Sequence, residues 1–78
     1  MPTYFFHLYN DEIVCDEEGQ ELADVEEAHR IAIVNAVEMA IAEVRQGCLN
    51  LKHRIDVADG GGSVVCTVRF QDVVKVVA

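Results

Sequence analysis

Basic residues are scarce in this 78-residue chain, which has six of them against 14 acidic ones, and tryptophan is absent. No Lys or Arg precedes Arg30, and the six basic residues are scattered along the rest of the sequence. Nucleic-acid binding needs clustered basic side chains that neutralise phosphates, so the composition argues against direct binding of DNA or RNA. Nine acids fall within residues 11–27. They predict a solvated, solubilising surface first and a surface for a basic protein partner second.

Long hydrophobic runs are also missing. No apolar stretch approaches the roughly 20 residues that a membrane-spanning helix needs, and the start lacks the basic and apolar segments of a secretory signal. The three cysteines, Cys15, Cys48 and Cys66, are odd in number and have no C-x-x-C spacing. These absences predict a soluble, cytoplasmic protein with free thiols and no membrane association.

The length predicts a single domain over residues 1–78. A domain of this size buries only about 60% of the surface that its unfolded chain exposes. Hydrophobic residues nevertheless make up 51% of the chain, so we expect some apolar surface to meet a partner.

An amino-terminal hairpin is predicted by the aromatic start. The segment from Thr3 to Tyr9 has strand-forming side chains, with Tyr4, Phe6 and Leu8 on one face and Phe5, His7 and Tyr9 on the other. Asn10-Asp11 is a plausible turn, and residues 13–15 then form a short second strand.

A long helix follows the acidic segment. Asp24 is a suitable N-cap with Glu27 at capping-box spacing, and Gly47 marks the end after Arg45. One broad apolar face is expected to pack on the sheet, comprising Val25, Ala28, Ala32, Ile33, Ala36, Val37, Met39, Ala40 and Val44. The opposite face is charged but interrupted by Ile31, Val34 and Ile41, which have no obvious core to enter.

Two strands complete the pattern. Residues 53–58 alternate as a half-buried strand, "DGGGS" is a turn, and residues 64–70 form a last long strand. Residues 72–78 fit either a helical turn or an edge strand. The order predicts an α+β, two-layer, ββαββ domain of about four antiparallel strands with the helix across one face.

Pro2 is a candidate site because removal of the initiator Met would expose a secondary amine. The start "MPTYFFHL" is superficially similar to small tautomerases, which use an amino-terminal proline as a base and place arginines around it. No Arg precedes Arg30 here, so a rigid strand start that needs no amide hydrogen is the favoured interpretation.

The other candidates favour structural roles. His7 and Cys15 on facing strands offer two metal ligands where zinc needs three or four, and "DEEG" lacks the alternation of a calcium loop. The glycines at 60–62 lie between two strands, as in a hairpin turn, and no Lys follows them as in a phosphate-binding loop. We therefore predict no catalytic residue, cofactor site or metal site.

The patterns "MPTYFFHL", "DEEGQELADVEEA", "HRIDVAD" and "GGGSVVCTVRF" resemble a family of short uncharacterised bacterial proteins that is called a domain of unknown function. The resemblance covers nearly the whole chain. It implies no chemistry, because no catalytic residue of that family is established. The positions that match its pattern are Tyr4, Phe5, Phe6, His7, Asp16, Gly19, Glu21, Leu22, Asp24 and Asp72.

A weaker resemblance links "DVEEAHRIAIVNA" to the amino-terminal part of HicB-type antitoxins. Those proteins cover a small basic RNA-cleaving toxin, a task that suits an acidic module. The chain departs from them because it lacks an appended DNA-binding segment and differs in its aromatic content.

The sequence favours a non-enzymatic interaction module that forms a homodimer or binds a protein partner, with self-association through Ile31, Val34 and Ile41. A binding surface is predicted at Tyr4, His7, Asp16 and Glu21. Two alternatives stay open, namely a small enzyme or ligand binder that uses Pro2 or His7, and an antitoxin-like module.

Overall fold

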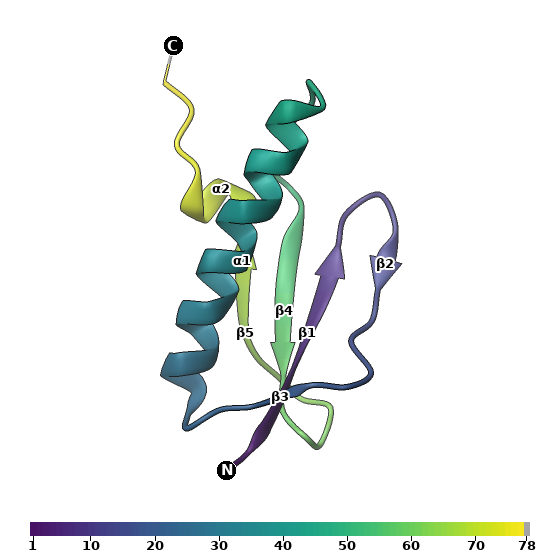
Figure 1. Ribbon diagram of the computed structural model, residues 1–78, viewed down its shortest axis with the longest axis vertical. Coiled ribbons are helices and arrows are strands. Elements are labelled where there is room, and N and C mark those ends of the chain that lie inside the picture. Colours follow the sequence, from purple (N-terminus) through teal and green to yellow (C-terminus); the bar gives the residue numbers. More distant parts are fainter. Residues whose placement is uncertain (78) are drawn as a thin grey trace.

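The amino-terminal strand β1 (Thr3–Tyr9) lies inside the sheet, as its two apolar faces require. A computed structural model describes residues 1–77 and gives the antiparallel strand order β2-β1-β4-β5, with β3 also paired to β1 (Figure 1). Strand β4 (Arg54–Ala58) pairs with β1 from Phe5 opposite Ala58 to Tyr9 opposite Arg54. The predicted α+β fold with one long helix is confirmed.

The edge beside β1 is interrupted. Strand β2 (Ile13–Val14) pairs with the end of β1, and strand β3 (Gln20–Glu21) pairs with its beginning. Residues 15–19 bulge away between them, where the sequence predicted only a loop. Within residues 1–77 the sheet therefore has five strands where about four were expected, because the chain returns to β1 after the bulge.

Helix α1 (Val25–Arg45) begins and ends where its capping residues predict. The Asp24 side chain accepts a hydrogen bond of 2.9 Å from the Glu27 N–H, which satisfies one free donor of the first turn. Gln46 is the C-cap, and Gly47 follows with a φ of +89°, a left-handed conformation that favours glycine.

Four alanines at intervals of four residues form the inner line of α1, namely Ala28, Ala32, Ala36 and Ala40, all buried. Their small side chains let the helix approach the sheet closely. The predicted apolar face was too broad, since Val25, Ile33 and Val44 are exposed by 39%, 36% and 59%. A line of alanines is narrow and leaves the flanking positions outside the contact.

Strand β5 (Val64–Arg69) forms the far edge, and α1 lies over β4 and β5 (Figure 1). The short helix α2 (Phe70–Val73) follows and buries Phe70 completely. Residues 74–77 form neither helix nor strand, and residue 78 lies outside the described residues. The open choice for residues 72–78 is thus resolved only in part, with a helical turn that ends at Val73.

The core lies between α1 and one face of the sheet. It contains the four alanines together with Tyr4, Leu22, Ile55, Val57, Val68 and Phe70. No helix within residues 1–77 is long and apolar enough to cross a membrane.

Candidate binding groove beside α1

A buried polar pair joins the end of α1 to the start of β4. His53 Nδ1 lies 2.8 Å from Glu43 Oε2, and His53 keeps only 9% of its surface exposed. The His53 ring packs edge-on against Phe70, with ring centroids 5.7 Å apart. Burial between these groups fixes the orientation of the imidazole.

Glu43 also organises the loop after the helix. Its second oxygen, Oε1, accepts a 3.0 Å hydrogen bond from the Asn50 N–H, and the Asn50 side chain in turn accepts one from the Lys52 N–H at 2.9 Å. Both Glu43 oxygens are therefore used, one for the loop and one for His53. The carboxylate is a positioning group held on a helix.

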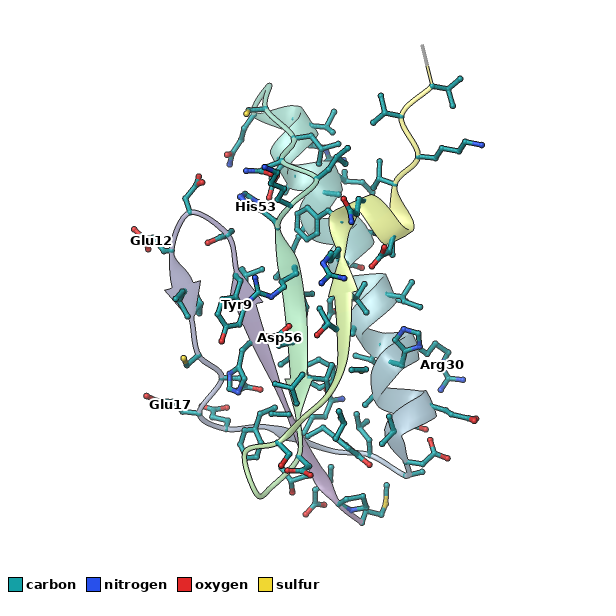
Figure 2. The ribbon with its side chains drawn as sticks, turned by 180° about the vertical axis from the view of Figure 1, so that it is seen from behind. Tyr9, Glu12, Glu17, Arg30, His53 and Asp56 are labelled. Carbon is teal, nitrogen blue, oxygen red and sulfur yellow. The ribbon has the colours of Figure 1, made fainter. Side chains whose placement is uncertain are left out.

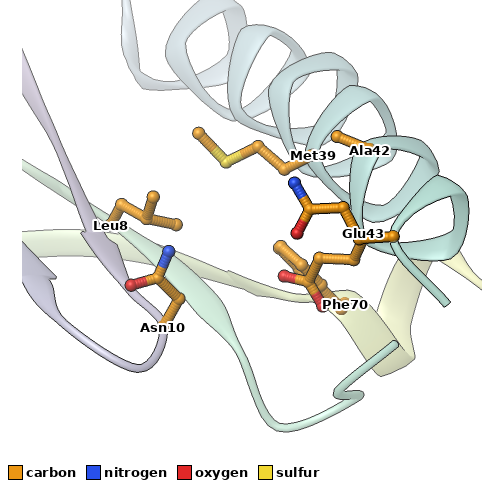
Figure 3. A pocket seen from close by; sticks show the side chains of 7 residues that line it. Leu8, Asn10, Met39, Ala42, Glu43 and Phe70 are labelled. Carbon is orange, nitrogen blue, oxygen red and sulfur yellow. The ribbon is translucent and has the colours of Figure 1, made fainter. Parts of the chain in front are cut away.

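Two cavities of about 220 Å³ each meet at Glu43. The first, which we call the apolar cavity, is lined by Leu8, Asn10, Met39, Ala42, Glu43, Gln46 and Phe70. Figure 3 shows Leu8 on β1 and Asn10 just after this strand across the space from Met39 and Glu43 on α1. The cavity exists because α1 lies over β4 and β5 and leaves the inner face of β1 partly uncovered.

The second cavity, which we call the polar cavity, is lined by Asn10, Asp11, Glu43, Gln46, Cys48, Asn50 and His53. The other ring nitrogen of His53, Nε2, lies here, 3.6 Å from Asp11 Oδ1. That distance is too long for a hydrogen bond. Because the two cavities share Asn10, Glu43 and Gln46, they form one groove with an apolar and a polar part.

A third, wider cavity of about 450 Å³ continues the groove along β1. It shares Leu8 and Met39 with the apolar cavity and is bordered by the acidic bulge at residues 15–18. Among the described residues, the linings of all three cavities contain several carboxylates and no Lys or Arg. The groove thus offers hydrogen-bond acceptors and negative charge beside apolar walls.

The opposite face of the sheet is polar and satisfies its own groups (Figure 2). Asp56, only 8% exposed, accepts a 2.9 Å hydrogen bond from the Thr67 hydroxyl and one of 3.3 Å from Arg54 Nε. The Arg54 guanidinium lies over the Tyr9 ring, 4.1 Å from its centroid. Both hydrogen bonds to Asp56 end on its Oδ1 oxygen, and the one from Thr67 ties β4 to its neighbour β5.

Asp16, one of the predicted binding residues, holds the bulge together. Its carboxylate accepts hydrogen bonds of 3.1 Å from the N–H groups of Phe6, Glu18 and Gly19. Partial burial alone would raise the pKa of Asp16, but the backbone hydrogen bonds from Gly19, Phe6 and Glu18 outweigh it and lower that pKa below its ordinary value. Asp16 thus replaces a missing strand partner of β1.

Tyr4 and His7 do not share a site. Tyr4 is 5% exposed and belongs to the core, so its assignment to a binding surface is corrected. His7 lies on the opposite face of β1, because positions three apart on a strand point to opposite sides. The His7 Nδ1 accepts a 3.0 Å hydrogen bond from the Asp16 N–H, which closes the bulge from its other side.

The remaining predicted residues are more accessible. Pro2 is exposed, and its carbonyl accepts a 3.0 Å hydrogen bond from the Leu22 N–H. Glu21 is exposed on β3. On α1, the side chains of Val34 and Ile41 are exposed by 52% and 47%, whereas Ile31 is half-buried and packs against the core. Ile31 is therefore less available for self-association than the other two residues.

Sequence reasoning missed Glu43 and His53. One signal was available, since Glu43 lies three residues after Ala40 and therefore continues the inner line of the helix. A carboxylate on an inner line needs a buried partner. The identity of that partner depends on the loop that returns residue 53 to the helix end, which no local pattern encodes.

Comparison with known proteins gives one result. A family model described as "Domain of unknown function (DUF6894)" matches residues 3–71. No curated protein and no solved structure matches the chain. The resemblance to HicB-type antitoxins has no support from these matches and stays a prediction.

Proposed function

The chain belongs to the DUF6894 family, a domain of unknown function, and we propose that it acts as a non-enzymatic interaction module that associates with a second copy of itself through the outer face of α1. The observation that carries this proposal is the outer stripe, which consists of Val34, Val37, Ile41 and Val44. Three of the four are exposed by 47–59%, and Val37 is half-buried.

The spacing of the outer stripe favours another helix as its partner. Its members follow one another at intervals of three, four and three residues, which is the a/d spacing of a helix-helix seam. The seam covers about 15 Å of helix, or nearly three turns. A contact of this length is small, so we expect weak association, in the micromolar range or above.

The free edge of β5 supports the same arrangement. Within residues 1–77, β5 pairs only with β4, whereas the opposite edge of the sheet is broken by the Asp16 bulge. Figures 1 and 2 both place α1 on the β5 side of the sheet. An unprotected edge strand is a template for pairing with another chain, so it supplies main-chain contacts beside the outer stripe.

Analytical ultracentrifugation over micromolar to millimolar concentration tests the proposal. We expect the wild type to dimerise and Ile41→Glu to weaken dimerisation about tenfold or more, because the change places a charge in the seam. Val25→Glu is the matched control, since it makes the same change at an exposed apolar position outside the outer stripe. A monomeric wild type, or equal dimerisation of Ile41→Glu and the wild type, would contradict the proposal.

A further inference from the structure

Glu43 determines which nitrogen of His53 carries the proton. A carboxylate only accepts hydrogen bonds, so the 2.8 Å contact with Glu43 Oε2 requires a proton on Nδ1. In the neutral ring, the nitrogen on the other side, Nε2, is then left with a lone pair. The polar cavity therefore receives an acceptor from a residue that is 9% exposed.

Two acceptors meet in the polar cavity without a donor between them. Nε2 of the neutral His53 ring and Asp11 Oδ1 are 3.6 Å apart, and neither can donate to the other. No hydrogen bond to Nε2 is formed within residues 1–77. Nε2 therefore faces the solvent-accessible polar cavity, where a ligand that brings donors would supply its hydrogen-bond partner.

The geometry points to the binding of an alkylammonium ion, with its charged end in the polar cavity and its aliphatic chain in the apolar cavity. An ammonium group has three donors and no acceptor, which matches His53 Nε2 and Asp11. Leu8, Met39 and Phe70 line the space that the chain would enter. Each cavity, at about 220 Å³, is below the roughly 300–1,000 Å³ of sites for drug-sized ligands, so the ligand must be small.

Other ligand classes fit less well. An anion would meet the carboxylates of Asp11 and Glu43 without a Lys or Arg among the described lining residues. The Nδ1–H hydrogen bond to Glu43 would leave Nε2 able to bind a metal ion, but zinc needs three or four protein ligands. No group of three metal-ligating side chains is found within residues 1–77. A free aliphatic amine and the lysine side chain of a protein both carry such an ammonium group, and different probes separate the two sources.

A titration with n-pentylamine at pH 8, followed by ¹H–¹⁵N NMR, tests the inference directly. We expect saturable shifts of the amide signals of Asn10, Gln46 and Asn50, with weaker binding of methylamine and no binding of 1-pentanol. Asp11→Asn should weaken pentylamine binding about two- to fivefold, the range of an exposed ion pair. Glu12→Gln is the matched control, because it removes the same charge from the same turn outside both cavity linings.

A second variant tests the role of the His53 lone pair. In Glu43→Gln, the amide oxygen is needed by the Asn50 N–H, so the amide NH₂ faces His53 Nδ1 and donates to it. The ring proton must then move to Nε2, which becomes a donor. We expect the ¹⁵N chemical shift typical of a protonated ring nitrogen to move from Nδ1 to Nε2. Pentylamine binding should then weaken about tenfold or more.

The outcomes are decisive in both directions. Saturable binding that Asp11→Asn and Glu43→Gln weaken, and Glu12→Gln does not, supports the inference. N-acetyl-lysine methylamide then distinguishes the sources, since equal binding indicates a protein lysine and absent binding a free amine. Equal effects of Asp11→Asn and Glu12→Gln on pentylamine binding would show general charge attraction and overturn the inference. Amide shifts that do not saturate, or methylamine binding as tight as that of pentylamine, would overturn it as well. So would a Glu43→Gln variant that has the exchanged His53 tautomer but binds pentylamine as tightly as the wild type. Dimerisation through α1 is measured separately, so failure of either proposal leaves the other intact.

Discussion

Replacement of Asp16 by Asn should destabilise the fold measurably. The Asn oxygen can still accept from Glu18 and Gly19, but its NH₂ group then faces the Phe6 N–H, so a donor meets a donor where Oδ2 now accepts at 3.1 Å. A hydrogen bond to a charged group contributes about 1.5–3 kcal/mol. Because the bulge is partly exposed, we expect Asp16→Asn to lower the free energy of unfolding by about 1–2 kcal/mol.

The effect should depend on pH with a defined sign. The pKa of Asp16 is lowered in the folded protein, from an ordinary value of 3.8. Its ionised form therefore stabilises the fold fully above that ordinary value, and this contribution is lost as the pH falls through the lower folded pKa. The difference in stability between the wild type and Asp16→Asn should accordingly be constant at neutral pH and shrink as the pH falls below the ordinary value of 3.8.

Urea unfolding followed by far-UV circular dichroism measures both quantities. The matched control is Glu17→Gln, which removes an exposed charge next to Asp16 and should change the stability by no more than about 0.5 kcal/mol. A domain of this size has a total stability of only about 4–12 kcal/mol, so the expected difference is readily resolved. Equal stability of Asp16→Asn and Glu17→Gln at neutral pH would refute the role of Asp16, and a difference that persists undiminished at low pH would refute the role of its charge.

Three further predictions follow from the packing. In urea unfolding, Gly19→Ala should lower the free energy of unfolding by about 1–3 kcal/mol, because the φ of +72° is left-handed and the new Cβ would lie 2.7 Å from Thr3 Cγ2. Gly60→Ala, which has open space around it, should leave the stability nearly unchanged. Phe70→Ala should cost about 3–5 kcal/mol, because the side chain is fully buried; a loss below 1 kcal/mol would contradict its place in the core. Partial burial and the charge of Asp56 raise the pKa of the Cys66 thiol, so iodoacetamide should label Cys66 more slowly than the exposed Cys48, and equal rates would argue against this environment.

Local patterns were sufficient where each residue's role depends on its neighbours in sequence. The strand from Thr3 to Tyr9, the cap at Asp24 and the helix end before Gly47 all lie where alternation, capping chemistry and glycine placed them. Each of these patterns involves residues that are about four positions apart or fewer, so it does not depend on the rest of the fold. The fold class was therefore predictable.

The groove was not predictable, because it depends on contacts between distant segments. Glu43 meets His53 and Asp11 approaches His53 only after the hairpin, the helix end and β4 have come together. The structural role of Asp16 was not predicted for a related reason, since its hydrogen bond from Phe6 depends on a bulge in an edge strand. Sequence identified the acidic segment as polar without revealing that one of its carboxylates is structural.

The position of β1 has a consequence for folding during synthesis. Its neighbour β4 is made about fifty residues later, with Phe5 opposite Ala58, so the central pair of the sheet cannot form until most of the domain has left the ribosome. Helix α1 can form earlier from local hydrogen bonds, but its line of alanines then has no surface to pack against. The nascent chain thus carries an aromatic strand whose β4 side stays unpaired for most of its synthesis. The nine acids within residues 11–27 keep this early part of the chain strongly charged until β4 is made.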